Sequence, residues 1–347
     1  MASERDNFDL SGPRNLHNLD WNDPSHRRIV AGALVQAVYV LERDRQEKRQ
    51  SPQDALAPAW WTFFHYNPVQ IMVDKVEGSI FGAVFERAEN EKHQTNIPRS
   101  VVAFRGSILK PETLRTDLKL DLVLITNGLH KTPRFDFALG AVRSAIAKHG
   151  HCKVWVAGHS LGAAFAMLAA RKLCEDEGLV LESYLFNPPF ASAPLERIKN
   201  EKVKLGFHVA HSFVTAGLAM AVIGKTQDGS DRDAFAALSS WTPNLYVNPA
   251  DDICSGYVGY FGNRERIHGM GFGVGRIDDF AARHSINESI MAAFGKESKA
   301  SYLIPSAKLT LNLGPSPDFK RAHGIHQWWS PDLQFRCTLF RLPASKT

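Results

Sequence analysis

A pentapeptide at residues 158–162, Gly-His-Ser-Leu-Gly, constrains the fold more than any other feature of this chain. The preceding run, residues 152–157, contains β-branched and aromatic residues and predicts a buried strand. The following run, residues 163–173, is rich in alanine, has no glycine or proline, and predicts a helix. A Gly-x-Ser-x-Gly motif between a strand and a helix is typical of a sharp turn that presents a nucleophilic serine. We therefore expect Ser160 to be a nucleophile.

Candidate strands and helices alternate along the rest of the chain. Apolar patterning predicts helices over residues 28–49 and 135–148. It predicts strands over 77–87, 100–105, 152–157, 179–186, 245–247 and 335–340. Alternation of this kind favours an α/β fold with a mostly parallel central sheet.

Composition indicates a globular protein with one large domain. The 347 residues are 44% hydrophobic and 22% charged, and 41 basic against 36 acidic residues leave a net charge of only +5, which does not favour nucleic-acid binding. Residues 1–25 form a polar segment that we expect to be loosely ordered, and residues 26–340 form a single domain. An apolar helical insertion is expected near 206–240, where the stretch 211–223 is too short to span a bilayer. It is either a buried helix or a helix beside a substrate pocket, and transient contact with a lipid surface is compatible with it.

The N-terminal residues carry acidic side chains and no apolar segment, so we expect no signal peptide and a cytoplasmic protein. Four scattered cysteines, Cys152, Cys174, Cys254 and Cys337, have no metal-binding spacing. The sequence therefore predicts no metal and no cofactor. It does not indicate an oligomeric state.

A serine nucleophile needs a histidine base, and in proteins with this turn the base follows the serine and the acid. This order leaves the downstream histidines His208, His211, His268, His284, His323 and His326. The base belongs on a loop near the last strands, which favours His323 or His326. We favour His323 because Gly324 follows it and suits a loop that must direct a side chain. His159, beside the serine, is interpreted as support for the turn.

The acid belongs on a loop that follows a strand. Residues 245–247 predict a strand, Pro249 ends it, and Asp251 and Asp252 follow. Asp251 is therefore the leading candidate, with Asp318 as the reserve. An acyl-transfer site also needs two backbone N–H donors for the developing oxyanion. We expect these from Leu161, directly after the serine, and from Ser107, just past the strand that ends in Phe-Arg-Gly-Ser.

Together these motifs resemble those of the class 3 lipases. The resemblance is strongest to plant lipase-like proteins often labelled GDSL esterase/lipase, although this chain has no GDSL motif. The best-matching segments are Tyr-Val-Asn-Pro-Ala-Asp at 246–251 and Ala-His-Gly-Ile-His-Gln-Trp-Trp at 322–329. The resemblance spans roughly residues 26–340.

The resemblance implies an α/β-hydrolase fold with helices on both faces of the sheet and a Ser160–His323–Asp251 triad. It also implies the oxyanion role for Ser107 and Leu161, and cleavage of carboxylic ester bonds in acyl lipids. The chain departs from the family pattern at Cys254, where a proline is usual. It also departs in a longer, more charged loop between Ser107 and Asp117.

Three functions are compatible with this set of residues. The first is a serine esterase or lipase, favoured because serine, acid and base are all present in order. The second is a catalytically silent lipase-fold module that binds a partner or signals. The third is acyl transfer to an alcohol other than water, which uses the same residues.

Overall fold

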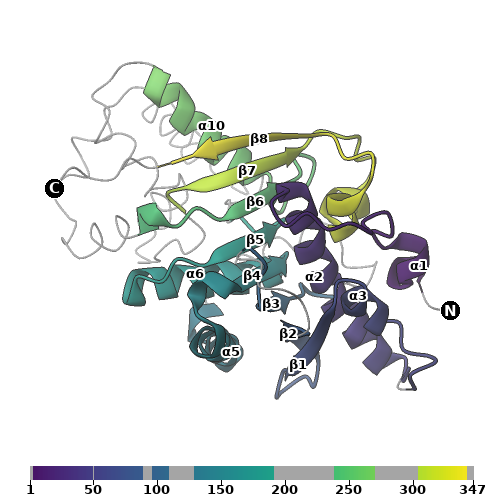
Figure 1. Cartoon of the computed structure of the whole chain (residues 1–347). Coiled ribbons are helices and arrows are strands. Elements are labelled where there is room, and N and C mark those ends of the chain that lie inside the picture. Colours follow the sequence, from purple (N-terminus) through teal and green to yellow (C-terminus); the bar gives the residue numbers. More distant parts are fainter. Residues whose placement is uncertain are drawn as a thin grey trace, which may run out of the picture.

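The computed structural model of the chain describes residues 3–49, 51–88, 96–108, 129–190, 238–269 and 304–341. A single eight-stranded sheet runs through this part of the chain, and its strands lie in sequence order (Figure 1). Strands β3 to β7 are parallel, whereas β1, β2 and β8 are antiparallel to their neighbours. The strands are β1 Tyr66–Val73, β2 Ile80–Arg87, β3 Ser100–Phe104, β4 Val154–His159, β5 Glu182–Phe186, β6 Asn244–Val247, β7 Ala307–Asn312 and β8 Phe335–Phe340.

Helices cover both faces of the sheet. Helix α2 packs on β2 to β5 on one face, and α5 and α6 pack together on β3 and β4 on the other (Figure 1). The α-helices are α1 Phe8–Ser11, α2 Pro24–Gln46, α3 Pro58–Thr62, α5 Pro133–His149, α6 Leu161–Glu177, α10 Gly256–Gly269 and α13 Phe319–His323. The 3-10 helices are η1 Glu4–Asp6, η3 Leu129–Lys131, η4 His151–Lys153, η6 Leu238–Ser240 and η7 Ile325–Trp329.

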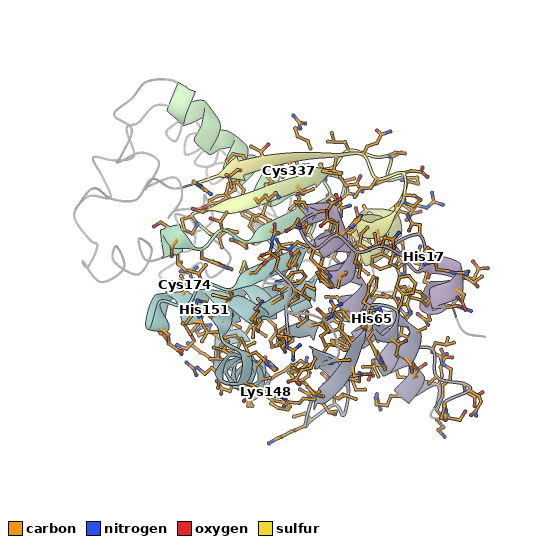
Figure 2. All side chains as sticks on the ribbon, in the orientation of Figure 1. His17, His65, Lys148, His151, Cys174 and Cys337 are labelled. Atoms are coloured by element: carbon orange, nitrogen blue, oxygen red, sulfur yellow. The ribbon has the colours of Figure 1, made fainter. Side chains whose placement is uncertain are left out.

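The hydrophobic core has two layers, one on each face of the central sheet. Successive side chains of a strand point to opposite faces. On β3, Val101 therefore packs beneath α2 while Val102 packs beneath α5 and α6, and on β4 Ala157 and Val156 divide in the same way. Figure 2 shows side chains filling the space between sheet and helices, with Cys174 on α6 and Cys337 on β8. The predicted α/β-hydrolase architecture, mostly parallel with helices on both faces, is confirmed.

The N-terminal segment differs from the sequence-based expectation. Residues 3–25 are polar overall, but Phe8, Leu16 and Trp21 are buried in the same core layer as α2. Phe8 contacts Trp60 edge to face, with ring centroids 5.2 Å apart. The expectation of loose order is therefore wrong for these residues, because three large apolar side chains are enough to hold the segment against α2 and α3.

Two strands were not predicted. The edge strand β1 contains Pro68 and buries only alternate side chains, and in the short strand β7 polar residues alternate with apolar ones. The apolar insertion predicted near 206–240 lies mainly outside the described residues, since residues 191–237 are not described. Within the described ranges, no helix is both long enough and apolar enough to cross a bilayer.

Candidate active site

Ser160 lies at the turn between β4 and α6, and its backbone is in an unusual conformation, with φ 54° and ψ −125°. The two motif glycines make this turn possible. A Cβ on Gly158 would lie 2.1 Å from the Gly162 carbonyl oxygen, and a Cβ on Gly162 would lie 2.3 Å from the carbonyl oxygen of Phe104. Only glycine fits at either position. The turn therefore has the strained geometry of a nucleophile elbow.

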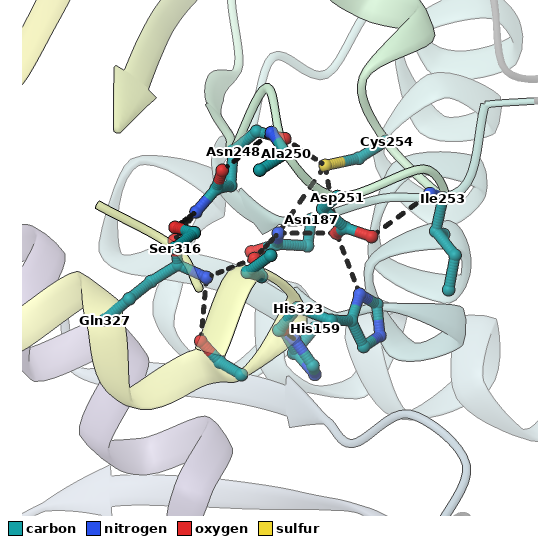
Figure 3. A network of polar contacts seen from close by, with 12 residues as sticks. His159, Asn187, Asn248, Ala250, Asp251, Ile253, Cys254, Ser316, His323 and Gln327 are labelled. Atoms are coloured by element: carbon teal, nitrogen blue, oxygen red, sulfur yellow. Dashed lines mark hydrogen bonds and ion pairs between the residues drawn. The ribbon is translucent and has the colours of Figure 1, made fainter. Parts of the chain in front are cut away.

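Asp251 lies just past β6, at the same edge of the sheet as Ser160, and is completely buried. Its Oδ2 accepts hydrogen bonds from His323 Nδ1 at 2.8 Å, Asn187 Nδ2 at 2.7 Å and the Cys254 thiol at 3.1 Å (Figure 3). Its Oδ1 accepts from the Ile253 backbone N–H at 3.1 Å. Four donors thus surround one buried carboxylate, which is how a protein keeps such a group ionised.

The protonation states of this cluster follow from its contacts. Burial opposes the charged form of Asp251, but the His323 charge and the hydrogen bonds from His323, Asn187 and Cys254 outweigh it and hold the pKa of Asp251 below its usual value. Burial and the adjacent carboxylate raise the pKa of the Cys254 thiol well above its usual value. The thiol therefore remains a proton donor to Asp251, a role that a proline at this position could not fill.

His323 ends α13 and is nearly buried, with 8% of its surface exposed. Because a carboxylate only accepts, His323 carries its proton on Nδ1, and Nε2 keeps a lone pair when the ring is neutral. The ring of Phe319 stacks on it, with centroids 5.2 Å apart and planes inclined by 9°. Asp251 and Phe319 together fix the orientation of the imidazole.

His159 connects the base to the serine turn. It directly precedes Ser160, and its Nε2 donates to the carbonyl oxygen of His323 at 2.7 Å. The rings of His159 and His323 lie 4.9 Å apart (Figure 3). The structure thus brings Asp251 and His323 into direct contact, and it holds the His323 backbone against the residue next to Ser160.

The reserve candidates lie elsewhere. His326 Nε2 is 3.3 Å from the Arg5 carbonyl oxygen, and burial lowers the pKa of His326 to about 4. Asp318 caps α13 by accepting from the Arg321 backbone N–H at 2.8 Å. Each has a structural partner away from Asp251. Of the other downstream histidines, His208, His211 and His284 lie outside the described residues, as does the side chain of His268 on α10.

The loop after β3 approaches the serine closely. A Cβ on Gly106 would lie 2.8 Å from Ser160 Cβ, so only a glycine allows this approach. The Gly106 carbonyl accepts from Arg105 Nη1 at 2.6 Å, and the Gly106 N–H donates to the Tyr39 hydroxyl at 2.7 Å. Ser107 follows on the exposed side of this loop. Leu161, on the other side of Ser160, is the first residue of α6, where backbone N–H groups have no partner within the helix.

Sequence reasoning missed Asn187 and Tyr39. Asn187 directly follows the strand expected over residues 179–186, and it is fully buried with a left-handed φ of 46°. Its amide donates to Asp251 and, at 3.2 Å, to the Ala322 carbonyl, and it accepts from the Trp328 indole at 2.7 Å. In the sequence, a polar residue directly after an apolar strand was the available signal. Tyr39 lies within the apolar pattern of a predicted helix, and nothing in the sequence marks it as part of the site.

Comparisons with known proteins identify lipase-like relatives of this chain. The family model described as Lipase (class 3) matches residues 101–186. An Arabidopsis thaliana protein named GDSL esterase/lipase is 44% identical over 355 residues, covering 98% of this chain and 99% of that protein.

Among solved structures, lipase II from Rhizopus niveus aligns with a TM-score of 0.37 and 13% identity, covering 69% of this chain and 76% of that one. A Rhizomucor miehei lipase propeptide complex aligns with a TM-score of 0.34 and 17% identity, covering 66% and 60%.

Proposed function

This chain belongs to the plant class 3 lipase-like proteins, and we propose that it is a carboxylic ester hydrolase that acts on acyl lipids through Ser160, His323 and Asp251. The observation that carries the proposal is the buried His323–Asp251 pair, 2.8 Å between Nδ1 and Oδ2. This pair lies at the carboxyl edge of the sheet, where the serine turn also lies, and ligands of α/β sheets bind at this edge.

In the proposed reaction, Ser160 Oγ attacks the acyl carbon of an ester while His323 Nε2 takes the serine proton. The carbonyl π electrons move to the oxygen, which becomes an oxyanion that the N–H groups of Ser107 and Leu161 stabilise. Collapse of this intermediate breaks the ester bond, and the proton on His323 passes to the leaving alcohol. Water then attacks the acyl-enzyme by the same route and releases the carboxylic acid.

Asp251 has two tasks in this scheme. It holds Nδ1–H of His323, so that Nε2 is the nitrogen that meets the serine, and it stabilises the imidazolium that forms during attack. Its low pKa keeps it ionised over the pH range in which a histidine base is useful. The hydrogen bonds from Asn187, Cys254 and Ile253 fix the position of the carboxylate, and His323 is the group that gains and loses a proton.

Turnover of p-nitrophenyl esters of increasing acyl length tests the proposal, with wild type compared with Ser160→Ala. We expect the variant to lose roughly 10⁴-fold or more in kcat. Ser144→Ala is the matched control, because Ser144 is an exposed serine on α5 whose hydroxyl donates only locally, to the Gly140 carbonyl. Preference for long acyl chains would support a lipid substrate. Wild-type turnover that Ser160→Ala retains would refute the proposal.

A further inference from the structure

A buried hydrogen-bond chain joins the loop that follows β3 to the backbone of His323. The Gly106 N–H donates to the Tyr39 hydroxyl at 2.7 Å, and Tyr39 Oη lies 2.8 Å from His159 Nδ1. His159 Nε2 then lies 2.7 Å from the His323 carbonyl oxygen. This hydrogen-bond chain runs through His159, the residue before Ser160, and connects residues that are far apart in sequence, from α2, β4 and α13.

The direction of every hydrogen bond in this chain is determined. A carbonyl oxygen only accepts, so His159 must donate from Nε2, and its Nδ1 is then an acceptor when the ring is neutral. The Tyr39 hydroxyl therefore donates to Nδ1, and its oxygen accepts from Gly106. Burial lowers the pKa of His159 to about 3 and raises that of Tyr39, so both side chains remain neutral at the pH at which a histidine base works. Only one arrangement of protons satisfies all the groups.

The geometry leaves little room for adjustment around this chain. A Cβ on Gly106 would lie 2.7 Å from the Tyr39 hydroxyl oxygen and 2.9 Å from the His159 carbonyl oxygen. Arg105 holds the other side of the same loop through the Gly106 carbonyl. Because the peptide between Gly106 and Ser107 is planar, fixing that carbonyl also fixes the direction of the Ser107 N–H.

We propose that Tyr39 and His159 are positioning residues, which hold the oxyanion loop and the base loop at a fixed spacing on either side of Ser160. This inference rests on the proposed hydrolase function. The two loops must be correctly spaced when the oxyanion forms, but substrate can bind without that precision. Removing a hydrogen bond between Gly106, Tyr39, His159 and His323 should therefore lower kcat and leave KM nearly unchanged.

Tyr39→Phe and Tyr66→Phe form a matched pair that tests the role of Tyr39. Both tyrosines are buried in the same core layer, and each hydroxyl has two polar partners. Those of Tyr39 are Gly106 and His159, and those of Tyr66 are the Pro98 carbonyl, at 3.0 Å, and Arg87. Tyr66 pairs with Arg87, at the end of the sheet opposite the serine turn. We expect Tyr39→Phe to lower kcat on a soluble ester about ten- to a hundredfold. Tyr66→Phe should change kcat less than about twofold, and thermal unfolding should show a comparable loss of stability for both variants.

Two variants at His159 test the second half of the chain. His159→Phe keeps a ring but cannot donate to the His323 carbonyl, and we expect a loss in kcat of about a hundredfold. His159→Gln restores an amide donor at a similar distance from the backbone, and it should recover part of that loss. KM should stay within about twofold of wild type in both variants.

The outcomes separate the inference from the proposed function. A folded wild type that hydrolyses no ester refutes the proposed function, and the positioning role with it. A wild type whose activity depends on Ser160, with kcat unchanged in Tyr39→Phe, refutes the positioning role alone. Equal losses of kcat in Tyr39→Phe and Tyr66→Phe would also refute it, because they would reflect general loss of packing.

Discussion

Replacing Asn187 with alanine should strongly destabilise the fold. The side chain is completely buried and makes four hydrogen bonds, to the Asp251 carboxylate, the Cys254 sulfur, the Ala322 carbonyl and the Trp328 indole. Alanine removes all four and leaves the indole N–H without this partner. It must also adopt the left-handed φ of 46°.

The magnitude follows from the individual contributions. A hydrogen bond to a charged group contributes about 1.5–3 kcal/mol, and a buried donor left without a partner costs about 1–3 kcal/mol. The left-handed backbone costs an L-residue without a polar side chain about 1–2 kcal/mol. Since one side chain makes all the contacts, these contributions are not fully additive, and we expect a loss of about 4 kcal/mol. That is a large fraction of the roughly 5–15 kcal/mol that stabilises a typical domain.

Urea unfolding of wild type, Asn187→Ala and Asn244→Ala measures this loss. Asn244 is a suitable control because it is half-buried at the start of β6 and its amide donates to the Ser183 carbonyl at 3.3 Å. We expect Asn244→Ala to lose about 1 kcal/mol or less. If Asn187→Ala loses no more free energy of unfolding than Asn244→Ala, the reasoning about the buried amide is wrong.

Three further predictions concern the same region. Cys254→Ala removes a donor to Asp251, so the pKa of that carboxyl should rise; an NMR titration of the Asp251 carboxyl that shows no rise would count against the thiol contact. Gly162→Ala introduces a methyl group 2.3 Å from a backbone oxygen and should lower the free energy of unfolding by about 3 kcal/mol. Gly140 has open space around it, so Gly140→Ala should raise the free energy of unfolding by about 0.5–1 kcal/mol. His159 has a pKa of about 3 when folded and 6.5 when unfolded, so unfolded chains bind more protons between these values. The free energy of unfolding should therefore fall as pH drops from about 6.5 to 4. His159 should contribute up to about 1.4 kcal/mol per pH unit to this fall, and His159→Gln should lack that part of the slope.

The local features of the site were predictable from sequence because they depend on short-range geometry. Gly158 and Gly162 are needed for close backbone approaches within and beside one turn, so the motif and its flanking patterns specify the elbow. Asp251 was predictable as the acid candidate because it follows a strand and a proline. His323 was favoured over His326 through the glycine that follows it, and the structure brings His323 to Asp251.

The contacts between distant segments were not predictable in the same way. Tyr39 and His159 are 120 positions apart, and nothing in the apolar pattern of α2 distinguishes Tyr39 from an ordinary core residue. The strand β1 was missed because an edge strand buries only one face and tolerates Pro68. The burial of Phe8 and Trp21 was missed because the residues around them are polar. The average polarity of the segment does not show that single apolar residues in it are buried.

The central claim is that Ser160 is an activated nucleophile, and covalent labelling tests it most directly. Wild type and Ser160→Ala should be treated with a fluorophosphonate, and the adduct should be located by mass spectrometry of the digested protein. We expect one equivalent of label on Ser160 in wild type and none in the variant. A folded wild type that takes up no label, or takes it up equally in Ser160→Ala, would contradict the account.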